Sequence, residues 1–173
     1  MPDLKTLIRE VPDFPQPGIL FKDITPLLTN GPAWQRVVDQ LADRYRNKID
    51  IVLGIESRGF LFGSALAYAL GCGHALVRKP GKLPAATFAA SYELEYGTDT
   101  VEIHQDAFPP NSRVLLIDDL LATGGTAQAA LSLAEKLQAH IVEAAFLIEL
   151  SFLGGRERLA PHAVFSFIQY DGE

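Results

Sequence analysis

The hydrophobic positions of this chain fall alternately into short continuous runs and into helical spacings. Continuous apolar runs predict strands over residues 49–55, 74–78, 114–117, 141–149 and 163–168. Apolar positions at helical spacing predict helices over 32–45, 60–70 and 127–137, and one or two helical turns over 154–160. Strands that alternate with helices predict an α/β fold, with a mainly parallel twisted sheet flanked by helices.

Two segments interrupt the alternation. Residues 88–95 and 100–104 predict two strands joined by a turn at 96–98, which form a hairpin inserted between the parallel strands. Residues 79–86 contain Pro80, Gly81 and Pro84 without any hydrophobic period, so they predict a loop.

The first 26 residues predict a short helix and then a packed loop. Apolar residues at helical spacing predict an amphipathic helix that ends at Pro12; they are Leu4, Leu7, Ile8 and Val11. The closely spaced prolines of residues 12–26 argue against a regular helix there. Four apolar side chains of this loop are expected to avoid water: Ile19, Leu20, Phe21 and Ile24.

Composition narrows the class of protein. The chain has 173 residues, of which 48% are hydrophobic and 21% charged, as expected for a single folded domain. The net charge of -6 argues against duplex nucleic acid as the main partner, because neutralising phosphates requires a basic face. The lone Cys72 excludes an intramolecular disulfide, and neither a secretion signal nor a membrane span is evident, so we expect a cytoplasmic protein.

The segment 114–126 carries the most informative chemistry. An apolar strand ends at Asp118 and Asp119, and Thr123-Gly-Gly-Thr126 then leads into a helix. Ligands of open α/β sheets lie beyond the carboxyl ends of the strands. Adjacent carboxylates accept hydrogen bonds from a diol, and the amides of a helix N-terminus bind phosphate. The spacing therefore favours a ribose 5-phosphate site.

Other interpretations of the same segment remain open on these residues alone. An apolar strand with two acids is also typical of the Walker B element of nucleotide hydrolases, and Gly-Gly-Thr could be a plain helix cap. The chain lacks the G-x-x-x-x-G-K-[ST] loop that such hydrolases require. A phosphoacceptor receiver would carry its acidic pair at the end of the first strand, whereas this pair comes late in the chain.

Five segments resemble the type I phosphoribosyltransferases, and within them the adenine phosphoribosyltransferases. In chain order they are Phe14-Pro-Gln-Pro-Gly-Ile-Leu-Phe-Lys-Asp-Ile-Thr-Pro26, Glu56-Ser-Arg-Gly-Phe60, Arg78-Lys-Pro-Gly-Lys-Leu-Pro84, Ser91-Tyr-Glu-Leu-Glu-Tyr-Gly97 and Asp118-Asp-Leu-Leu-Ala-Thr-Gly-Gly-Thr126. They span nearly the whole chain in the order of that family. The resemblance implies transfer of a phosphoribosyl group from phosphoribosylpyrophosphate (PRPP) to adenine, with Mg²⁺ as cofactor.

The resemblance also implies which residues bind PRPP. Asp118 and Asp119 would hold the ribose hydroxyls, and the 5-phosphate would lie on Ala122, Thr123, Gly124, Gly125 and Thr126. The pyrophosphate loop would be Glu56, Ser57, Arg58 and Gly59, with a cis peptide between its first two residues and with Arg58 acting on the leaving pyrophosphate. Further phosphate contacts would come from Arg78, Lys79, Lys82 and Tyr96.

The remaining implied roles concern the base and a partner subunit. Residues 12–26 match a hood over the purine, in which Phe21 stacks on adenine while the backbone of Leu20 and Lys22 reads its edge. Glu95 matches a carboxylate that assists proton transfer on the purine. The metal would be held mainly by PRPP and water, and the family's arginine at position 78 implies a homodimer.

The sequence departs from the family pattern at two positions. Pro80 stands where a basic residue is frequent, and Glu56 where aspartate is common. A transferase for another purine is the nearest alternative, although it would lack this hood. A PRPP-sensing regulator would carry a basic DNA-binding domain, for which 173 residues leave no room.

Overall fold

The computed structural model describes residues 3–93 and 97–172. These residues form two compact units, one that ends at Arg44 and one that runs from Tyr45 to Gly172. Glu95 and Tyr96, which the resemblance places in the site, lie outside the described residues. Among the helices of the described ranges, none is both long and apolar enough to cross a membrane.

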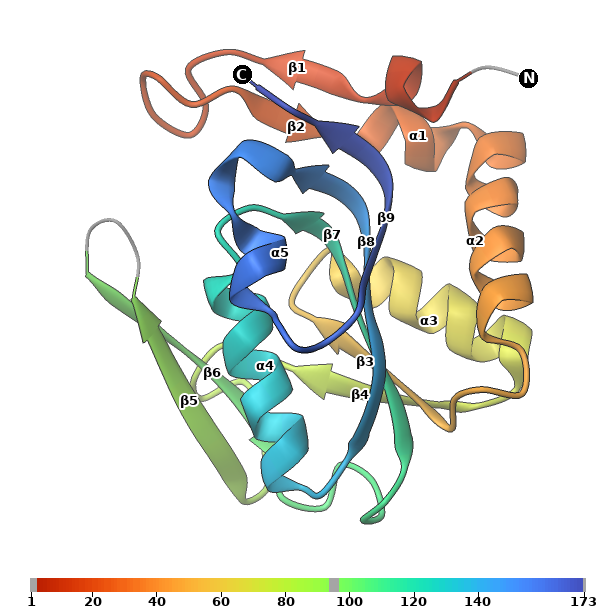
Figure 1. Ribbon diagram of the computed structural model, residues 1–173, viewed down its shortest axis with the longest axis vertical. Coiled ribbons are helices and arrows are strands. Elements are labelled where there is room, and N and C mark those ends of the chain that lie inside the picture. The colour runs from red at the N-terminus through yellow and green to blue at the C-terminus, as the bar shows by residue number, and fades with distance from the viewer. Residues whose placement is uncertain (1–2, 94–96, 173) are drawn as a thin grey trace. The chain divides into compact units, whose positions relative to one another are not determined.

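The second unit contains a five-stranded sheet (Figure 1). The strands lie in the order β4 (Gly73–Val77), β3 (Ile51–Ile55), β7 (Arg113–Leu121), β8 (His140–Leu150) and β9 (Val164–Tyr170). Every neighbouring pair is parallel. The predicted parallel α/β sheet is therefore confirmed.

Helices cover both faces of this sheet (Figure 1). One face packs on α4 (Gly125–Lys136) through a buried apolar cluster that includes Leu53, Leu116 and Phe146. The other face packs on α3 (Gly59–Leu70), whose Phe60 ring lies against Gly54 of β3. After β8 come the 3-10 turn η2 (Ser151–Leu153) and the short helix α5 (Gly155–Arg158). Strands buried on both faces explain the continuous apolar runs of the sequence.

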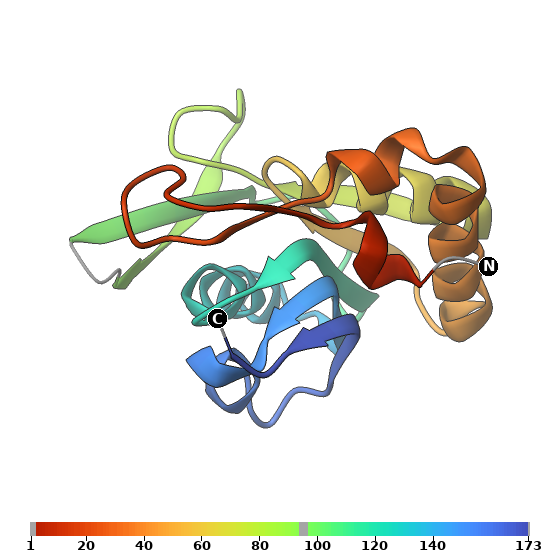
Figure 2. The same ribbon diagram turned by 90° about the horizontal axis from the view of Figure 1, so that it is seen from above.

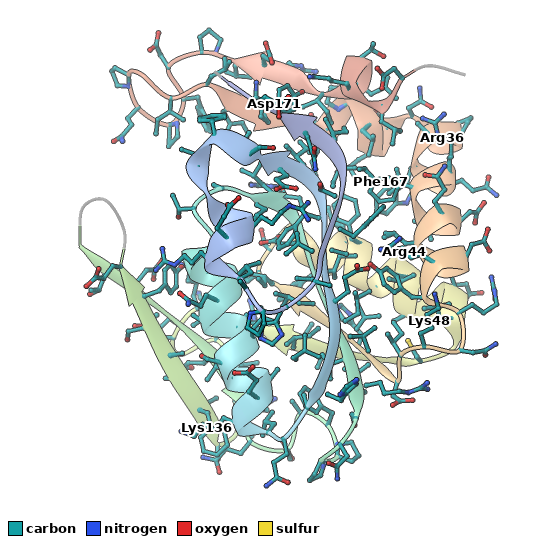
Figure 3. The ribbon with its side chains drawn as sticks, in the orientation of Figure 1. Arg36, Arg44, Lys48, Lys136, Phe167 and Asp171 are labelled. Carbon is teal, nitrogen blue, oxygen red and sulfur yellow. The ribbon has the colours of Figure 1, made fainter. Side chains whose placement is uncertain are left out.

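The predicted hairpin is confirmed as a separate two-stranded sheet. Strands β5 (Thr87–Glu93) and β6 (Thr98–His104) are antiparallel and extend away from the central sheet (Figure 2). The hairpin packs on α4, and at the end of that helix the Lys136 ammonium lies 4.2 Å from the centroid of the Phe88 ring (Figure 3). Such a cation–π contact helps to hold the hairpin on the helix.

The strand before the candidate site is longer than predicted. We predicted a strand over residues 114–117, but β7 continues to Leu121, and Asp118 is in register with Phe146 of β8. The hydrogen bonds between strands are made by backbone groups, so polar side chains at the carboxyl edge of the sheet do not prevent them. The two acidic residues are therefore fixed by the ladder of the sheet rather than by a loop.

The first unit differs more from its prediction. Only Leu4–Leu7 form a helical turn, the 3-10 helix η1, and strand β1 (Arg9–Val11) pairs antiparallel with β2 (Phe21–Asp23). The predicted helix up to Val11 is wrong, because a helix this short has too few internal hydrogen bonds to compete with strand pairing.

The proline-rich segment is also partly regular. Strand β2 lies within it, and helix α1 (Thr25–Thr29) begins there, with Pro26 in its first turn, where a missing N–H costs nothing. Ile19 is 38% exposed, so the expectation that it avoids water is wrong. The predicted helix over 32–45 is confirmed as α2 (Gly31–Tyr45).

An exposed ion pair fixes the amino end of β7 to the start of β3. Arg113 donates from Nη2 to Asp50 Oδ1 at 2.7 Å and from Nε to Asp50 Oδ2 at 3.1 Å. The hydrogen bonds and the charge of Arg113 lower the pKa of Asp50 from 3.8 to about 2.

This pair allows a direct test by titration. Carboxyl-carbon NMR is expected to give Asp50 a pKa of about 2, and a clearly higher pKa in the Arg113→Gln variant, which loses the guanidinium but keeps the backbone N–H bond from residue 113 to Asp50 Oδ2. Because the folded-state pKa is lowered, the pair stabilises the fold above the ordinary aspartate pKa, and that contribution disappears as the pH falls through about 2. An unchanged Asp50 pKa in the variant would contradict the assignment.

Candidate active site

The acidic pair lies at the carboxyl end of β7, in the middle of the sheet. Asp118 Oδ1 accepts a hydrogen bond from the Asp119 N–H at 2.8 Å. Asp118 also lies against Gly59 at the start of α3, where an added Cβ atom would come within 2.9 Å of Oδ1. A glycine at position 59 thus leaves the space that the Asp118 carboxylate occupies.

The environment of Asp118 disfavours its charge. Burial raises the pKa of its carboxyl group well above the ordinary value, and the negative charge of Asp119 raises the pKa further. Carboxylates whose pKa is perturbed by burial and by a like charge are concentrated at functional sites. The pair therefore has the electrostatic character expected of a ligand-binding centre.

The loop after β7 reaches the N-terminus of α4. Gly124 caps that helix with φ at 81°, and no side chain caps the helix at this position. The first amides of a helix have no partner within the helix, and its dipole favours a negative charge at this end. The segment from Ala122 to Thr126 is therefore suited to an anion such as a phosphate.

The loop from Glu56 to Gly59 lies beside the acidic pair. Its first peptide, between Glu56 and Ser57, is cis, as the resemblance implies. Arg58 donates from Nε to Asp119 Oδ2 at 2.5 Å, with the carboxylate buried and 44% of the arginine side chain exposed. The structure thus brings the predicted pyrophosphate loop and the predicted ribose residues together.

Glu56 connects this loop with the end of β4. Its carboxylate accepts hydrogen bonds from the Lys79 N–H at 2.8 Å and from Arg78 Nε at 3.2 Å. Burial alone would raise the pKa of Glu56, but the Lys79 N–H and the Arg78 guanidinium outweigh burial and lower the pKa. Arg78 in turn donates from Nη1 to the carbonyl oxygen of Lys82 at 3.3 Å, and Lys82 itself is exposed.

Lys79 is held by two residues that the sequence did not single out. Its ammonium pairs with the Asp99 carboxylate and donates to Tyr92 Oη at 3.3 Å. Burial alone would lower the pKa of Lys79, but these two partners raise it. Tyr92 and Asp99 are opposite each other in the β5–β6 register. The hairpin prediction began the second strand at residue 100, so this pairing was missed.

The residues of the predicted hood lie in the first unit and are described there by themselves. Phe21 is half-buried and makes an edge-on contact with the Phe14 ring, at 5.1 Å between ring centroids. Lys22 is buried and donates from Nζ to Glu10 Oε1 at 2.5 Å, across the β1–β2 pair. Leu20 is half-buried just before β2. The predicted base-reading residues therefore belong to one small antiparallel ribbon.

A dedicated metal cage is not found among residues 3–93 and 97–172, where no three His, Cys, Asp or Glu side chains converge. The carboxylates of Asp118 and Asp119 are nevertheless the kind of oxygen donor that Mg²⁺ prefers, and Mg²⁺ often binds through one or two carboxylates together with substrate phosphates. The residues present fit a cation that arrives with a phosphorylated substrate.

Together these groups can bind an extended polyanion. Asp118 and Asp119 offer acceptors for a diol, and the first amides of α4 follow them in the chain. Arg58 belongs to the Glu56–Gly59 loop, and Arg78 is hydrogen-bonded to Glu56 of that loop. A ligand with a phosphate at one end, a diol in the middle and a second anionic group at the other end matches this order of groups.

Comparison with known proteins gives one consistent family. Residues 27–169 match the phosphoribosyl transferase domain. The chain is 60% identical over 169 residues to an adenine phosphoribosyltransferase of Chloroflexus aurantiacus, covering 97% of this chain and 98% of that protein.

Two solved structures are similar over almost their whole length. The adenine phosphoribosyltransferase of Thermoanaerobacter pseudethanolicus is 50% identical, with a TM-score of 0.93, and the match covers 96% of this chain and 98% of that one. The enzyme of Saccharomyces cerevisiae, solved with D-2,5-dideoxy-2,5-imino-altritol 1,6-bisphosphate and adenine, is 46% identical, with a TM-score of 0.89 and coverage of 95% and 96%.

Proposed function

Because this chain belongs to the phosphoribosyl transferase domain family, we propose that it transfers the 5-phosphoribosyl group of PRPP to adenine, giving AMP and pyrophosphate. Relatives that match it over nearly their full length carry this activity in their names. One relative was solved with adenine bound. The base specificity of those relatives is the reason for proposing adenine rather than another purine.

The observation that carries the proposal is the order of groups along the end of β7. Asp118 and Asp119 come first, and the loop Ala122–Thr126 follows at the start of α4. Carboxylates that accept from two ribose hydroxyls would fix the sugar, while helix amides would receive its 5-phosphate. A sugar held at both ends presents C1 in a fixed orientation.

The chemical step breaks the bond between C1 and the pyrophosphate oxygen and forms a bond from C1 to purine N9. Positive charge develops on the ribose ring while negative charge collects on the leaving pyrophosphate. Asp118 and Asp119 would hold the ring in place, and Arg58 and Arg78 would stabilise the leaving group. The substrate must then compete with Asp119 for Arg58, since the two are paired in the structure.

Adenine would be held by the residues of the first unit. Phe21 would stack on the purine, and the backbone of Leu20 and Lys22 would read its edge. Glu95 is proposed to exchange a proton with the base, which contributes about 10²–10⁴-fold when the proton moves in the transition state. Tyr96 would lie over the phosphates. Exclusion of water from the bound substrates would protect PRPP from hydrolysis.

Mg²⁺ is the proposed cofactor, bound mainly to PRPP oxygens and water, and it would neutralise charge on the pyrophosphate. Asp118 and Asp119 would offer carboxylate oxygens of the kind that Mg²⁺ prefers. Further PRPP contacts are proposed for Ser57 and Gly59 of the pyrophosphate loop and for Lys79 and Lys82.

We further propose one functional domain over residues 1–173, with the purine hood at 12–26 and the flexible loop and hairpin at 79–98. A homodimer is proposed because the family's arginine at position 78 can reach the partner's pyrophosphate. The cytoplasm is the proposed location, which the single cysteine of the chain supports.

The decisive assay offers the protein PRPP and Mg²⁺ with adenine, hypoxanthine, guanine or xanthine in turn. We expect AMP and pyrophosphate with adenine, and little product with the other three bases. Chromatography of the nucleotide products identifies each outcome. Turnover of a different base would move the proposal to another transferase, and the absence of any nucleotide would reject it.

A further inference from the structure

The helical turn α5 lies directly against the candidate phosphate loop. A Cβ atom added at Gly155 would overlap the carbonyl oxygen of Ala122, and one added at Gly124 would come within 2.9 Å of the Gly155 carbonyl oxygen. Gly155 is buried. The backbones of the two segments therefore touch, and the position of one fixes the position of the other.

An ion pair anchors α5 to the sheet next to this contact. Arg156 donates from Nε to Glu149 Oε1 at 2.8 Å and from Nη2 to Glu149 Oε2 at 2.5 Å, and a third bond runs from Nη1 to the Val164 carbonyl oxygen at 2.7 Å. Such a two-pronged arginine–carboxylate pair fixes orientation as well as distance. Arg156 thus joins the carboxyl end of β8 and the amino end of β9 to the helical turn.

The carboxylate of this pair is built into the same edge of the sheet as the site. Glu149 is 3% exposed and is in register with Leu121, the last residue of β7. It also accepts from Ser166 Oγ at 2.6 Å. The Arg156 hydrogen bonds lower the pKa of Glu149, so the pair stays ionised at neutral pH. A buried charge with this many partners holds its neighbours rigidly.

We propose that Arg156 is a positioning residue for the 5-phosphate of the substrate: held by Glu149, it presses Gly155 against Ala122 and so keeps the Ala122–Thr126 amides aimed at the phosphate. This inference rests on the proposed function, which assigns the 5-phosphate to that loop. Arg156 itself does not touch the substrate. Preorganised amides bind an anion better than a loop that must first be ordered.

Arg156→Lys keeps the charge but loses the two-pronged geometry. We expect its KM for PRPP and its dissociation constant for ribose 5-phosphate to rise about tenfold, equivalent to about 1.4 kcal/mol. The KM for adenine should stay within about twofold, because the loop does not contact the base. A purely structural role for Arg156 would shift both KM values and kcat together.

The matched control is Arg113→Lys. Arg113 makes the same kind of two-pronged pair with Asp50, but at the opposite end of β7. We expect no change in the KM for PRPP or in ribose 5-phosphate binding for this variant. Equal effects at both positions, or an Arg156→Lys variant with unchanged PRPP parameters, would overturn the inference.

Hydrogen exchange in the unmodified protein keeps the inference testable even if the variant does not fold. Coupling is reciprocal, so ribose 5-phosphate should slow amide exchange in Gly155–Leu159 as well as in Ala122–Thr126, whereas adenine should not. Protection confined to Ala122–Thr126, or failure of ribose 5-phosphate to bind, would overturn the role of Arg156. Failure of the proposed function would appear separately, as absence of AMP in the assay with PRPP and adenine.

Discussion

Replacement of both Asp118 and Asp119 by asparagine is expected to cause a large loss of activity while the protein stays folded. Each carboxylate would lose a charge-assisted hydrogen bond to a ribose hydroxyl, worth about 1.5–3 kcal/mol. Together the two losses lower kcat/KM by about 10²–10⁴-fold. Steady-state kinetics with PRPP and adenine measures this fall, and circular dichroism verifies the fold. Retained activity would reject the ribose assignment.

The single Asp118→Asn variant carries a second expected result, on stability. Burial and the charge of Asp119 raise the folded-state pKa of Asp118. A raised carboxyl pKa means that the folded state binds the proton more tightly than the unfolded state. The stability that the protonated Asp118 contributes is fully present below the ordinary aspartate pKa and is lost as the pH rises through the folded-state pKa. Asparagine mimics the protonated form. Asp118→Asn should therefore raise the melting temperature at neutral pH, and the gain should shrink in acid.

Asp106→Asn is the matched control for this variant. Asp106 is exposed in the turn after β6, and its substitution removes the same single charge. We expect both the melting temperature and kcat/KM of Asp106→Asn to stay close to those of the unmodified protein. A lower melting temperature for Asp118→Asn at neutral pH would contradict the unfavourable burial of that carboxylate.

The central sheet could be predicted because its signals are local. Runs such as Val114–Ile117 are apolar throughout, which only strands buried on both faces require. The order of β4, β3 and β7 brings Glu56–Gly59 and Asp118–Asp119 to one edge, and this follows from the direction of parallel strands. The sequence alone was therefore enough to predict which segments lie next to each other at the candidate site.

The parts that were not predicted depend on contacts between segments distant in sequence. The N-terminal helix was wrong because β2, ten residues further on, offers β1 a partner. The roles of Tyr92 and Asp99 depend on the register of a hairpin whose second strand was predicted to begin at residue 100, whereas β6 begins at Thr98. The approach of Gly155 to Ala122 leaves no local pattern at all, since a glycine reveals nothing of what lies against it.

Gly124→Ala is expected to cause the other large loss of activity. Gly124 has φ at 81°, which costs other residues about 1–2 kcal/mol. An added methyl group would also come within 2.9 Å of the Gly155 carbonyl oxygen and 3.2 Å of its Cα atom. Overpacking of this kind costs about 1–3 kcal/mol. Neither backbone can yield cheaply, because the Glu149–Arg156 pair anchors α5.

The loop should respond to the added methyl group by moving its amides out of line with the phosphate. Loss of two such charge-assisted contacts lowers kcat/KM for PRPP by about 10²-fold or more. Kinetics at varied PRPP concentration, with adenine saturating, measures the fall. The KM for adenine should change far less, because the residues proposed to hold adenine, Leu20, Phe21 and Lys22, are not part of this loop.

Gly71→Ala separates the steric clash from the backbone strain. Gly71 also has a positive φ, at 65°, but no atom lies within 4 Å of the position that its Cβ would take. Its substitution should lower the free energy of unfolding by about 1–2 kcal/mol and leave the KM for PRPP unchanged. If the two variants lose stability equally and neither changes the KM for PRPP, then the contact between Gly124 and Gly155 does not control the phosphate loop. A raised KM for PRPP in Gly124→Ala but not in Gly71→Ala would show that this contact controls the phosphate loop. Of these two glycines, Gly124 is the one with another backbone segment packed against it.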